Sequence, residues 1–144
     1  MLRLTTVLLT ILTTTSSFAQ IAEPNKAGVA MGHLHYQVRD VEANKRFWMA
    51  LGGTPIAHAD AVVVKFPDVL VFLTQGDSTG GTDGSVVNHV AFRVQSFSTV
   101  EAAGLKVTRL ANFPGVGSTN TPEGERIELF ENASLLANLL VGRH

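Results

Sequence analysis

The protein is a chain of 144 residues in which 11 Lys and Arg face 12 Asp and Glu, giving a formal net charge of −1 at pH 7. This near-neutral balance, with no run of basic residues, argues against a nucleic-acid partner. Because the sequence contains no cysteine, disulfides and thiolate metal ligands are excluded.

The first residues predict a cleaved secretory signal peptide. Arg3 is followed by the apolar run Leu4–Leu12, a Ser/Thr-rich stretch and small residues up to Ala19. The apolar run is too short to cross a bilayer as a helix, and its many β-branched residues disfavour an ordinary N-terminal helix. We therefore expect a Sec-type signal over residues 1–19, cleavage after Ala19, and a secreted or periplasmic mature protein.

The first half of the mature chain reads as a strand, a helix and three strands. Met31–Val38 alternates apolar and polar residues, which indicates a half-buried strand. Asp40 is a suitable N-cap for a helix whose aromatic pair, Phe47 and Trp48, we assign to the core, and Gly52 follows its end. The runs TPIAHA, AVVVKF and VLVFLTQ then predict a meander of short antiparallel strands.

A polar segment separates this half from a second one. Gln75–Ser85 has no apolar residue and four glycines among its eleven residues, which predicts a flexible connection. Beyond it, VVNHVAFRV reads as a strand and SFSTVEAAG as a short helix, and KVTRLANF and RIELFEN read as further strands. GVGSTNTPEGE reads as a turn-rich stretch, and ASLLANLL as an apolar C-terminal helix.

The same order of elements thus occurs twice, which suggests an internal repeat. Shifting the sequence by 56 positions places His33 on His89 and Phe72 on Glu128. We expect one domain over residues 20–144, made of module one at about 31–75, a linker at 76–85, module two at about 86–131, and a C-terminal helix at 132–141.

The polar faces of three predicted strands carry the candidate site residues, opposite apolar faces. They are His33, His35 and Gln37 in the first strand, His89 and Arg93 in the strand after the linker, and Arg126 and Glu128 in the last strand. Two neutral imidazoles and a carboxylate suit a divalent Zn, Fe, Mn, Co or Ni ion. A solvated sheet face would show the same alternation, so spacing alone leaves both interpretations open.

The stretch GHLHYQVRDVEANKRFWMALGG resembles the opening of proteins of the vicinal oxygen chelate superfamily, which includes glyoxalases, bleomycin-resistance proteins and extradiol dioxygenases. The shared features are a strand-borne histidine (His33), an aspartate seven residues later (Asp40), and a helix with an aromatic pair and a Leu-Gly end. NHVAFRV and TPEGERIELFE are similar to the second half of such proteins. The resemblance covers about Gly32–Glu131.

This resemblance implies an α+β fold of two βαβββ modules forming a cupped, partly closed mixed sheet with helices on the outside. It implies a divalent metal held by His33, His89 and Glu128. Glyoxalase-like members take a fourth ligand from the last strand of the first module, where this chain has Phe72 instead. His35 or a partner chain would have to supply that group.

The remaining site residues are assigned roles in catalysis and substrate binding. His35 is assigned as a catalytic acid or base. The alternatives are that His35 hydrogen-bonds to a metal ligand, that it is itself a metal ligand, or that it is a solvated surface residue. Gln37, Arg93 and Arg126 are assigned to substrate binding, because paired guanidinium hydrogen bonds suit an anionic group. The face on which His58 lies is not fixed by the pattern.

We therefore expect an exported glyoxalase- or dioxygenase-like protein that binds a divalent metal and acts on a small oxygen-rich substrate. Isomerase, lyase, oxygenase and transferase chemistry all stay open, and the assignment as an enzyme is itself an expectation. The alternative is a metal-free small-ligand-binding protein of the bleomycin-resistance type. The expected partner is a small molecule, with no nucleic acid, no membrane after signal cleavage, and a homodimer as an open possibility.

Overall fold

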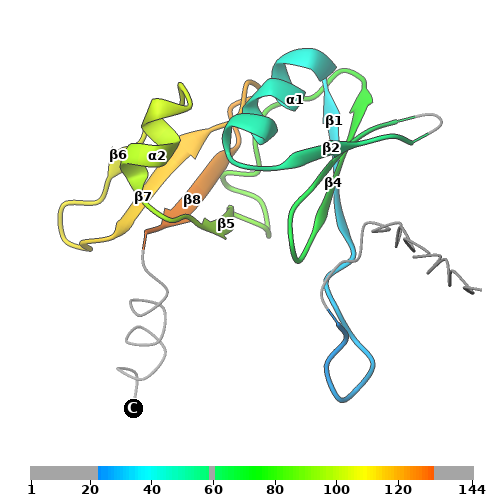
Figure 1. Ribbon diagram of the computed structural model, residues 1–144. Helices are drawn as coiled ribbons and strands as arrows, with labels where there is room; N and C mark the ends of the chain where they lie inside the picture. The colour runs from blue at the N-terminus through cyan, green and yellow to red at the C-terminus, as the bar shows by residue number, and fades with distance from the viewer. Residues whose placement is uncertain (1–22, 59–60, 132–144) are drawn as a thin grey trace, which may run out of the picture.

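The computed structural model describes residues 23–58 and 61–131 (Figure 1). The predicted signal peptide over residues 1–19 and the predicted C-terminal helix over 132–141 lie outside this range, so both stay predictions. Among the described residues, no helix is long and apolar enough to cross a membrane.

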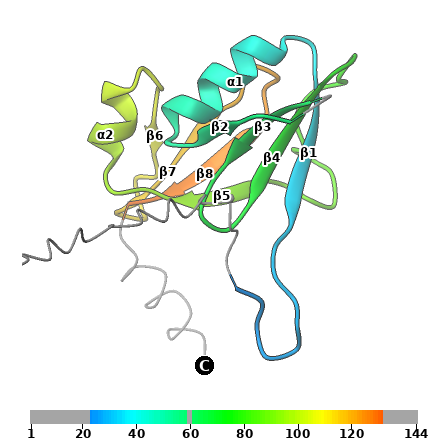
Figure 2. The same cartoon turned by 45° about the vertical axis from the view of Figure 1, so that its right-hand side comes forward.

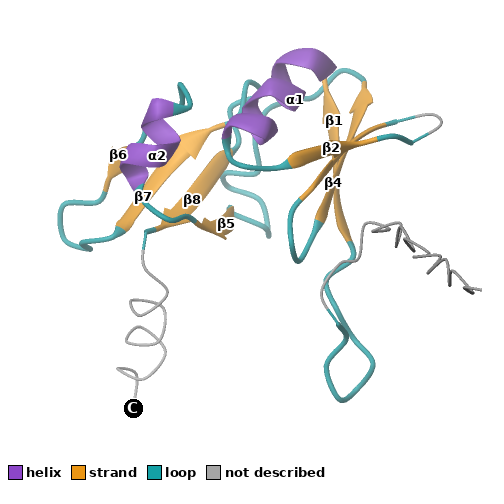
Figure 3. Cartoon of the chain, in the orientation of Figure 1, coloured by secondary structure: helices purple, strands orange, loops and turns teal. Residues whose placement is uncertain are grey.

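Two modules with the same order of elements follow one another along the chain (Figure 3). The first contains β1 (His33–Val38), α1 (Val41–Ala50), β2 (Thr54–Ile56), β3 (Val62–Lys65) and β4 (Leu70–Gln75). The second contains β5 (Val90–Arg93), α2 (Phe97–Ala102), β6 (Thr108–Arg109), β7 (Val116–Asn120) and β8 (Arg126–Phe130). The prediction of an α+β fold built from two βαβββ modules is confirmed.

Each module forms its own four-stranded mixed sheet. The strand orders are β1-β4-β3-β2 and β5-β8-β7-β6, with one parallel pair in each sheet, β1 with β4 and β5 with β8. Leu34 pairs with Val71 in the first sheet, and Val90 pairs with Ile127 in the second, so both partners are shifted by the same 56 positions. The register therefore supports the internal repeat. The two sheets do not join and are not closed, which differs from the cupped, partly closed sheet that the resemblance implies. Strands β1 and β5 are edge strands.

Both helices begin where the sequence predicts. The Asp40 side chain accepts a hydrogen bond from the Ala43 backbone N–H at 2.8 Å, which caps α1. Ser96 caps α2 through the Thr99 N–H at 3.1 Å. Gly52 follows α1 with φ at +102°, a left-handed conformation that favours glycine at a helix end.

Helix α1 covers one face of the first sheet (Figure 2). It also contacts the second module, since the Asn44 side-chain amide donates to Glu123 Oε1 at 3.3 Å. Trp48 is fully buried, and its ring lies 5.3 Å from that of Tyr36 and 5.7 Å from that of Phe92 on β5. Buried residues of both modules form one hydrophobic cluster that includes Phe47 and Leu129. The assignment of the helix aromatic pair to the core is confirmed.

The structure corrects two features of the sequence interpretation. The stretch expected to be turn-rich contains strand β7, because the backbone of Val116–Asn120 pairs with both β6 and β8. Gly117 permits this packing, since a Cβ there would lie 3.1 Å from the Thr108 carbonyl oxygen. The linker expected to be flexible is held by side-chain hydrogen bonds from Ser78 to Glu123 and from Thr82 to the Asn88 carbonyl.

Candidate functional site

Two of the three predicted metal ligands lie side by side in the second module. Glu128 lies on β8, and His89 immediately precedes β5, the parallel neighbour of that strand. The His89 Nε2 and Glu128 Oε2 atoms are 3.2 Å apart. The two side chains are 30% and 19% exposed, so a small ligand can reach both.

The second ring nitrogen of His89 has two competing partners. Asn88 Oδ1 lies 2.8 Å from His89 Nδ1, and Arg126 Nη2 lies 2.6 Å from the same atom. If Nδ1 carries the proton, it donates to Asn88 and leaves the Nε2 lone pair free for a metal. If Arg126 donates to Nδ1, Nε2 carries the proton and donates to Glu128. The choice of tautomer is therefore coupled to the position of Arg126.

His33, the third predicted ligand, lies on the other sheet. Its ring contacts those of Phe72, at a centroid distance of 5.0 Å, and His35, at 6.2 Å. Over residues 23–58 and 61–131, no group of three His, Asp or Glu side chains is arranged to hold a metal ion. One copy of the chain therefore brings together two of the predicted ligands, and the role of His33 stays a prediction.

The predicted catalytic residue and one substrate-binding residue share the open face of β1 with His33. His35 Nε2 lies 3.2 Å from the Thr74 hydroxyl on β4. Gln37 is exposed, and its side chain lies so close to Gly76 that a Cβ at that position would clash with the Gln37 amide nitrogen. Tyr36 points to the opposite, helix-covered side, as strand alternation predicts. His58, which the sequence left unplaced, lies against Phe72 with ring centroids 5.5 Å apart.

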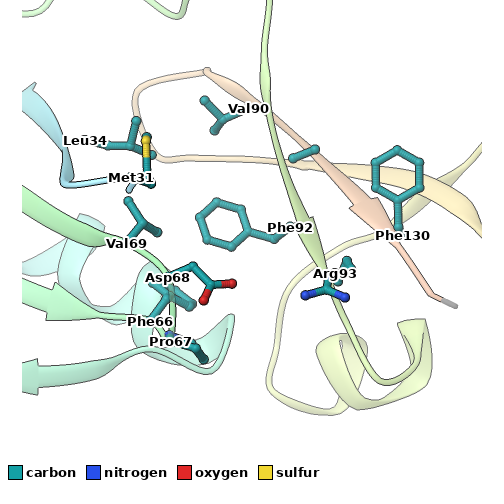
Figure 4. Close-up of a pocket in the computed structure, with 11 residues that line it drawn as sticks. Met31, Leu34, Phe66, Pro67, Asp68, Val69, Val90, Phe92, Arg93 and Phe130 are labelled. Carbon is teal, nitrogen blue, oxygen red and sulfur yellow. The ribbon is translucent and has the colours of Figure 1, made fainter. Parts of the chain in front are cut away.

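The other two substrate-binding candidates are separated. Arg126 lies beside His89, whereas Arg93 lines a cavity of about 500 Å³ between β1, the β3–β4 turn and β5 (Figure 4). Apolar side chains form most of its wall, and Asp68 and Arg93 are its charged groups. Within the part of the chain that the structure describes, no hydrogen bond or ion pair holds the Arg93 guanidinium. It is therefore available to an anionic group.

Two carboxyl groups of the β7–β8 turn, the half-buried Glu123 and the buried Glu125, were not assigned a role from the sequence. Glu123 accepts hydrogen bonds from Ser78, from the Arg39 backbone and side chain, and from Asn44. The Ser78 hydroxyl and the Arg39 donors lower the pKa of Glu123 to about 2. Because Arg39 and Asn44 belong to the first module, Glu123 ties the β7–β8 turn to the start of α1.

Glu125 lies in the same turn, and its residue is 4% exposed. Burial raises the pKa of its carboxyl group. The Tyr36 hydroxyl donates to Glu125 Oε1 at 3.3 Å, and burial together with this carboxylate raises the pKa of Tyr36 above its ordinary value. Acidic residues in a Pro-Gly turn were the available sequence signal, but they do not reveal which segment the turn contacts.

No protein-family model matches the sequence, and no curated protein matches it. Solved structures do match. Fosfomycin resistance protein FosX from Mesorhizobium loti is 19% identical, with a TM-score of 0.56 over 76% of this chain and 94% of that one. FosX from Listeria monocytogenes is 16% identical, with a TM-score of 0.56 over 82% and 98%. The antibiotic-binding protein TnmS3 from a Streptomyces species is 18% identical, with a TM-score of 0.54 over 74% and 98%.

The chain has the vicinal oxygen chelate fold. At these identities the likeness establishes the fold and not the reaction. The fold that the sequence resemblance implied is confirmed. In this vicinal oxygen chelate fold, the repeat places Phe72 in the first module at the position that Glu128 has in the second.

Proposed function

We propose that the protein is an exported vicinal oxygen chelate enzyme that binds one divalent metal per site and acts on a small, oxygen-rich molecule. The observation that carries this proposal is the His89–Glu128 pair, whose facing atoms lie 3.2 Å apart on a partly exposed face. Isomerase, lyase, oxygenase and transferase chemistry are all compatible with this pair. The FosX neighbours are named for fosfomycin resistance, and that substrate is not carried over to this chain.

The chemistry of the pair fits a divalent metal. Imidazole nitrogen and carboxylate oxygen are common ligands of zinc and of first-row transition metals. Once Arg126 leaves Nδ1, the Asn88 oxygen at 2.8 Å from that nitrogen favours the His89 tautomer whose Nε2 can bind metal. A bound divalent ion would supply Lewis acidity to substrate oxygens.

The residues of the chain itself would bind the substrate and move its protons. Arg126 would hold an anionic substrate group once it leaves His89, since a guanidinium donates two parallel hydrogen bonds to a carboxylate. His35 would exchange a proton with the substrate, oriented by the Thr74 hydroxyl.

A second copy of the chain would supply the third ligand, His33. His33 lies on β1 and His89 directly precedes β5, and both strands are sheet edges. Contact between the β1 edge of one copy and the β5 edge of another would therefore bring His33 toward the His89–Glu128 pair. A two-fold symmetric dimer repeats this contact and would form two equivalent sites.

Metal analysis of the purified protein tests the proposal. We expect wild-type protein to retain about one divalent ion per chain, and Glu128→Ala to bind metal at least about tenfold more weakly, because it removes a ligand. Glu101→Ala is the matched control, since it removes an exposed carboxylate paired with Arg109 on the far side of the module. If wild type and Glu128→Ala retain equally little metal, the proposal is wrong.

Export is a separate part of the proposal, and it rests on the sequence of residues 1–19. We expect the mature protein recovered from cells to begin at Gln20, which N-terminal sequencing or intact mass measurement would show. Arg3→Glu should slow processing, because a positive N-terminal region is part of the signal. Recovery of the full-length chain in the cytoplasm alone would contradict export.

The cavity beside Arg93 favours a second candidate function, metal-free binding of a small ligand. An apolar wall with one unpaired cation suits a small apolar carboxylate. Phe66 and Phe92 line the cavity and also contact Trp48, the only tryptophan, so ligand entry should change its fluorescence.

Titration of chelator-treated protein with 2-naphthoate distinguishes the two functions. If the cavity is the binding site, Arg93→Ala should weaken binding about tenfold, while Arg109→Ala, an exposed ion-pair residue, should not. The cavity lies along β1 and β5, the same edges that the proposed dimer would use. Tight binding by a monomer would therefore favour this second function over the metal enzyme.

A further inference from the structure

The face of the first sheet that α1 does not cover is apolar at its centre. One row of directly paired residues, Ile56, Val63, Phe72 and His35, crosses all four strands on this side. Val63 is only 1% exposed, yet it is outside the hydrophobic cluster beneath α1.

Three imidazole rings surround Phe72 on this face. The ring centroids of His33, His35 and His58 lie 5.0, 5.8 and 5.5 Å from that of Phe72. All three histidine residues are exposed, while Phe72 is half-buried among them. We call this set of four residues the aromatic face. Its rings lie at the distances at which aromatic side chains stack or meet edge to face.

The internal repeat allows the aromatic face of the first module to be compared with the equivalent positions of the second module. In the second module, the position equivalent to Phe72 is Glu128, which meets His89 through polar atoms. In the first module, the equivalent pair is Phe72 and His33, and they meet through their rings. None of these histidines belongs to a metal-binding group within the described residues. The first module thus presents ring surfaces where the second presents a ligand pair.

We propose that the aromatic face binds a planar aromatic ring of the substrate. The inference deepens the proposed function, on which it rests, by naming the substrate class. Surrounding aromatic surfaces favour a flat π-electron system over a saturated ring of the same size, because only the flat ring can lie against Phe72 and present its edge to the imidazoles. His33 belongs both to this face and to the proposed ligand set, so the aromatic ring would bind next to the oxygens held at the metal.

A pair of ligands, compared in wild type and in a Phe72 variant, separates ring recognition from metal binding. Salicylate and 2-hydroxycyclohexanecarboxylate both offer a carboxylate and a neighbouring hydroxyl, and they differ in the aromaticity of the ring and in the acidity of the hydroxyl. Because the more acidic phenol also binds metal better, the part of the preference that depends on Phe72 is the part that reports ring recognition. We expect wild-type protein to bind salicylate about tenfold more tightly by calorimetry. Phe72→Leu, which keeps an apolar side chain without a ring, should reduce this preference to less than about twofold. His58→Leu should reduce it in part.

The controls keep the two proposals distinguishable. Phe113→Leu removes a half-exposed phenyl group of the second module and should leave the preference unchanged. Metal content is measured on each variant, and Phe72→Leu should retain the wild-type amount. A preference that depends on Phe72 in protein without metal would support the aromatic face and contradict the metal site. Equal binding of the two ligands by wild type, no binding of either, or an unchanged preference in Phe72→Leu would overturn the inference.

Discussion

At the scale of single residues, Glu123 and Glu125 show how environment separates two identical side chains. Glu123 accepts several hydrogen bonds that favour its charged form, and its pKa falls to about 2. Glu125 is buried with the Tyr36 and Thr82 hydroxyls as partners, and burial raises its pKa. The first carboxylate therefore stabilises the folded protein when charged, whereas ionisation of the second destabilises it.

The two residues should give opposite pH dependences of stability. Glu123 stabilises the fold above pH 4.5, and this contribution should disappear as the pH falls from 4.5 to about 2. We expect urea unfolding to show Glu123→Gln less stable than wild type at pH 7, with the gap closing toward pH 2.

Glu125→Gln serves as the matched comparison. Because the folded state raises the pKa of Glu125, its contribution is most favourable below pH 4.5 and is lost as the pH rises through the folded-state pKa. Glu125→Gln should therefore gain stability relative to wild type between acidic and neutral pH. The same pH trend in both variants would contradict the assignment of opposite shifts.

At the scale of elements, the linker is an exposed segment that is hydrogen-bonded to the β7–β8 turn. Gly81 lies so close to the β7–β8 turn that a Cβ there would be 2.6 Å from the Glu125 Cα and 2.8 Å from the Gly124 carbonyl oxygen. Ser78 and Thr82 hydrogen-bond to the same turn from either side of Gly81. The linker thus helps to hold the strand that carries Glu128.

Gly81→Ala should destabilise the protein by about 1–3 kcal/mol, because the new methyl group meets backbone atoms that cannot move independently. Chemical denaturation would measure the loss. Gly32→Ala is the control, since a Cβ at Gly32 meets nothing within 4 Å, and its effect should stay within about 0.5 kcal/mol. Equal effects of the two substitutions would show that the linker is not packed as described.

Local sequence patterns predicted the features that depend only on neighbouring residues, namely strand faces and helix starts. Alternation predicted the two faces of β1, and Asp40 predicted the start of α1, since caps and strand faces depend on neighbouring residues. Strand β7 was missed because its Gly, Ser, Thr and Asn content is typical of turns. Its pairing with β6 and β8 is a tertiary contact that the local pattern does not contain.

At the scale of the whole molecule, the sequence predicted which side chains could form a site. It did not predict the distances between those side chains. The repeat offset predicted the equivalence of Phe72 and Glu128, and the His89–Glu128 contact agrees with the predicted faces. The distance between His33 and that pair could not be predicted, because it depends on how two separate sheets are placed. The role of Asn88 was also missed, because it depends on the 2.8 Å contact between its side-chain oxygen and His89 Nδ1, which the sequence does not reveal.

The proposal that two copies share each site can be tested by mixing two variants that each fail to bind metal. His33→Ala damages the half of a site on β1, and Glu128→Ala damages the half on β8. If each site combines both copies, a mixed dimer has one intact site and one doubly damaged site. Random pairing after joint refolding should then restore about one quarter of the wild-type metal content.

Mixing His89→Ala with Glu128→Ala is the control, because both substitutions damage the same half and no pairing restores a site. If every site were built within one chain, neither mixture would recover metal, and equal results from the two mixtures would therefore contradict the shared site.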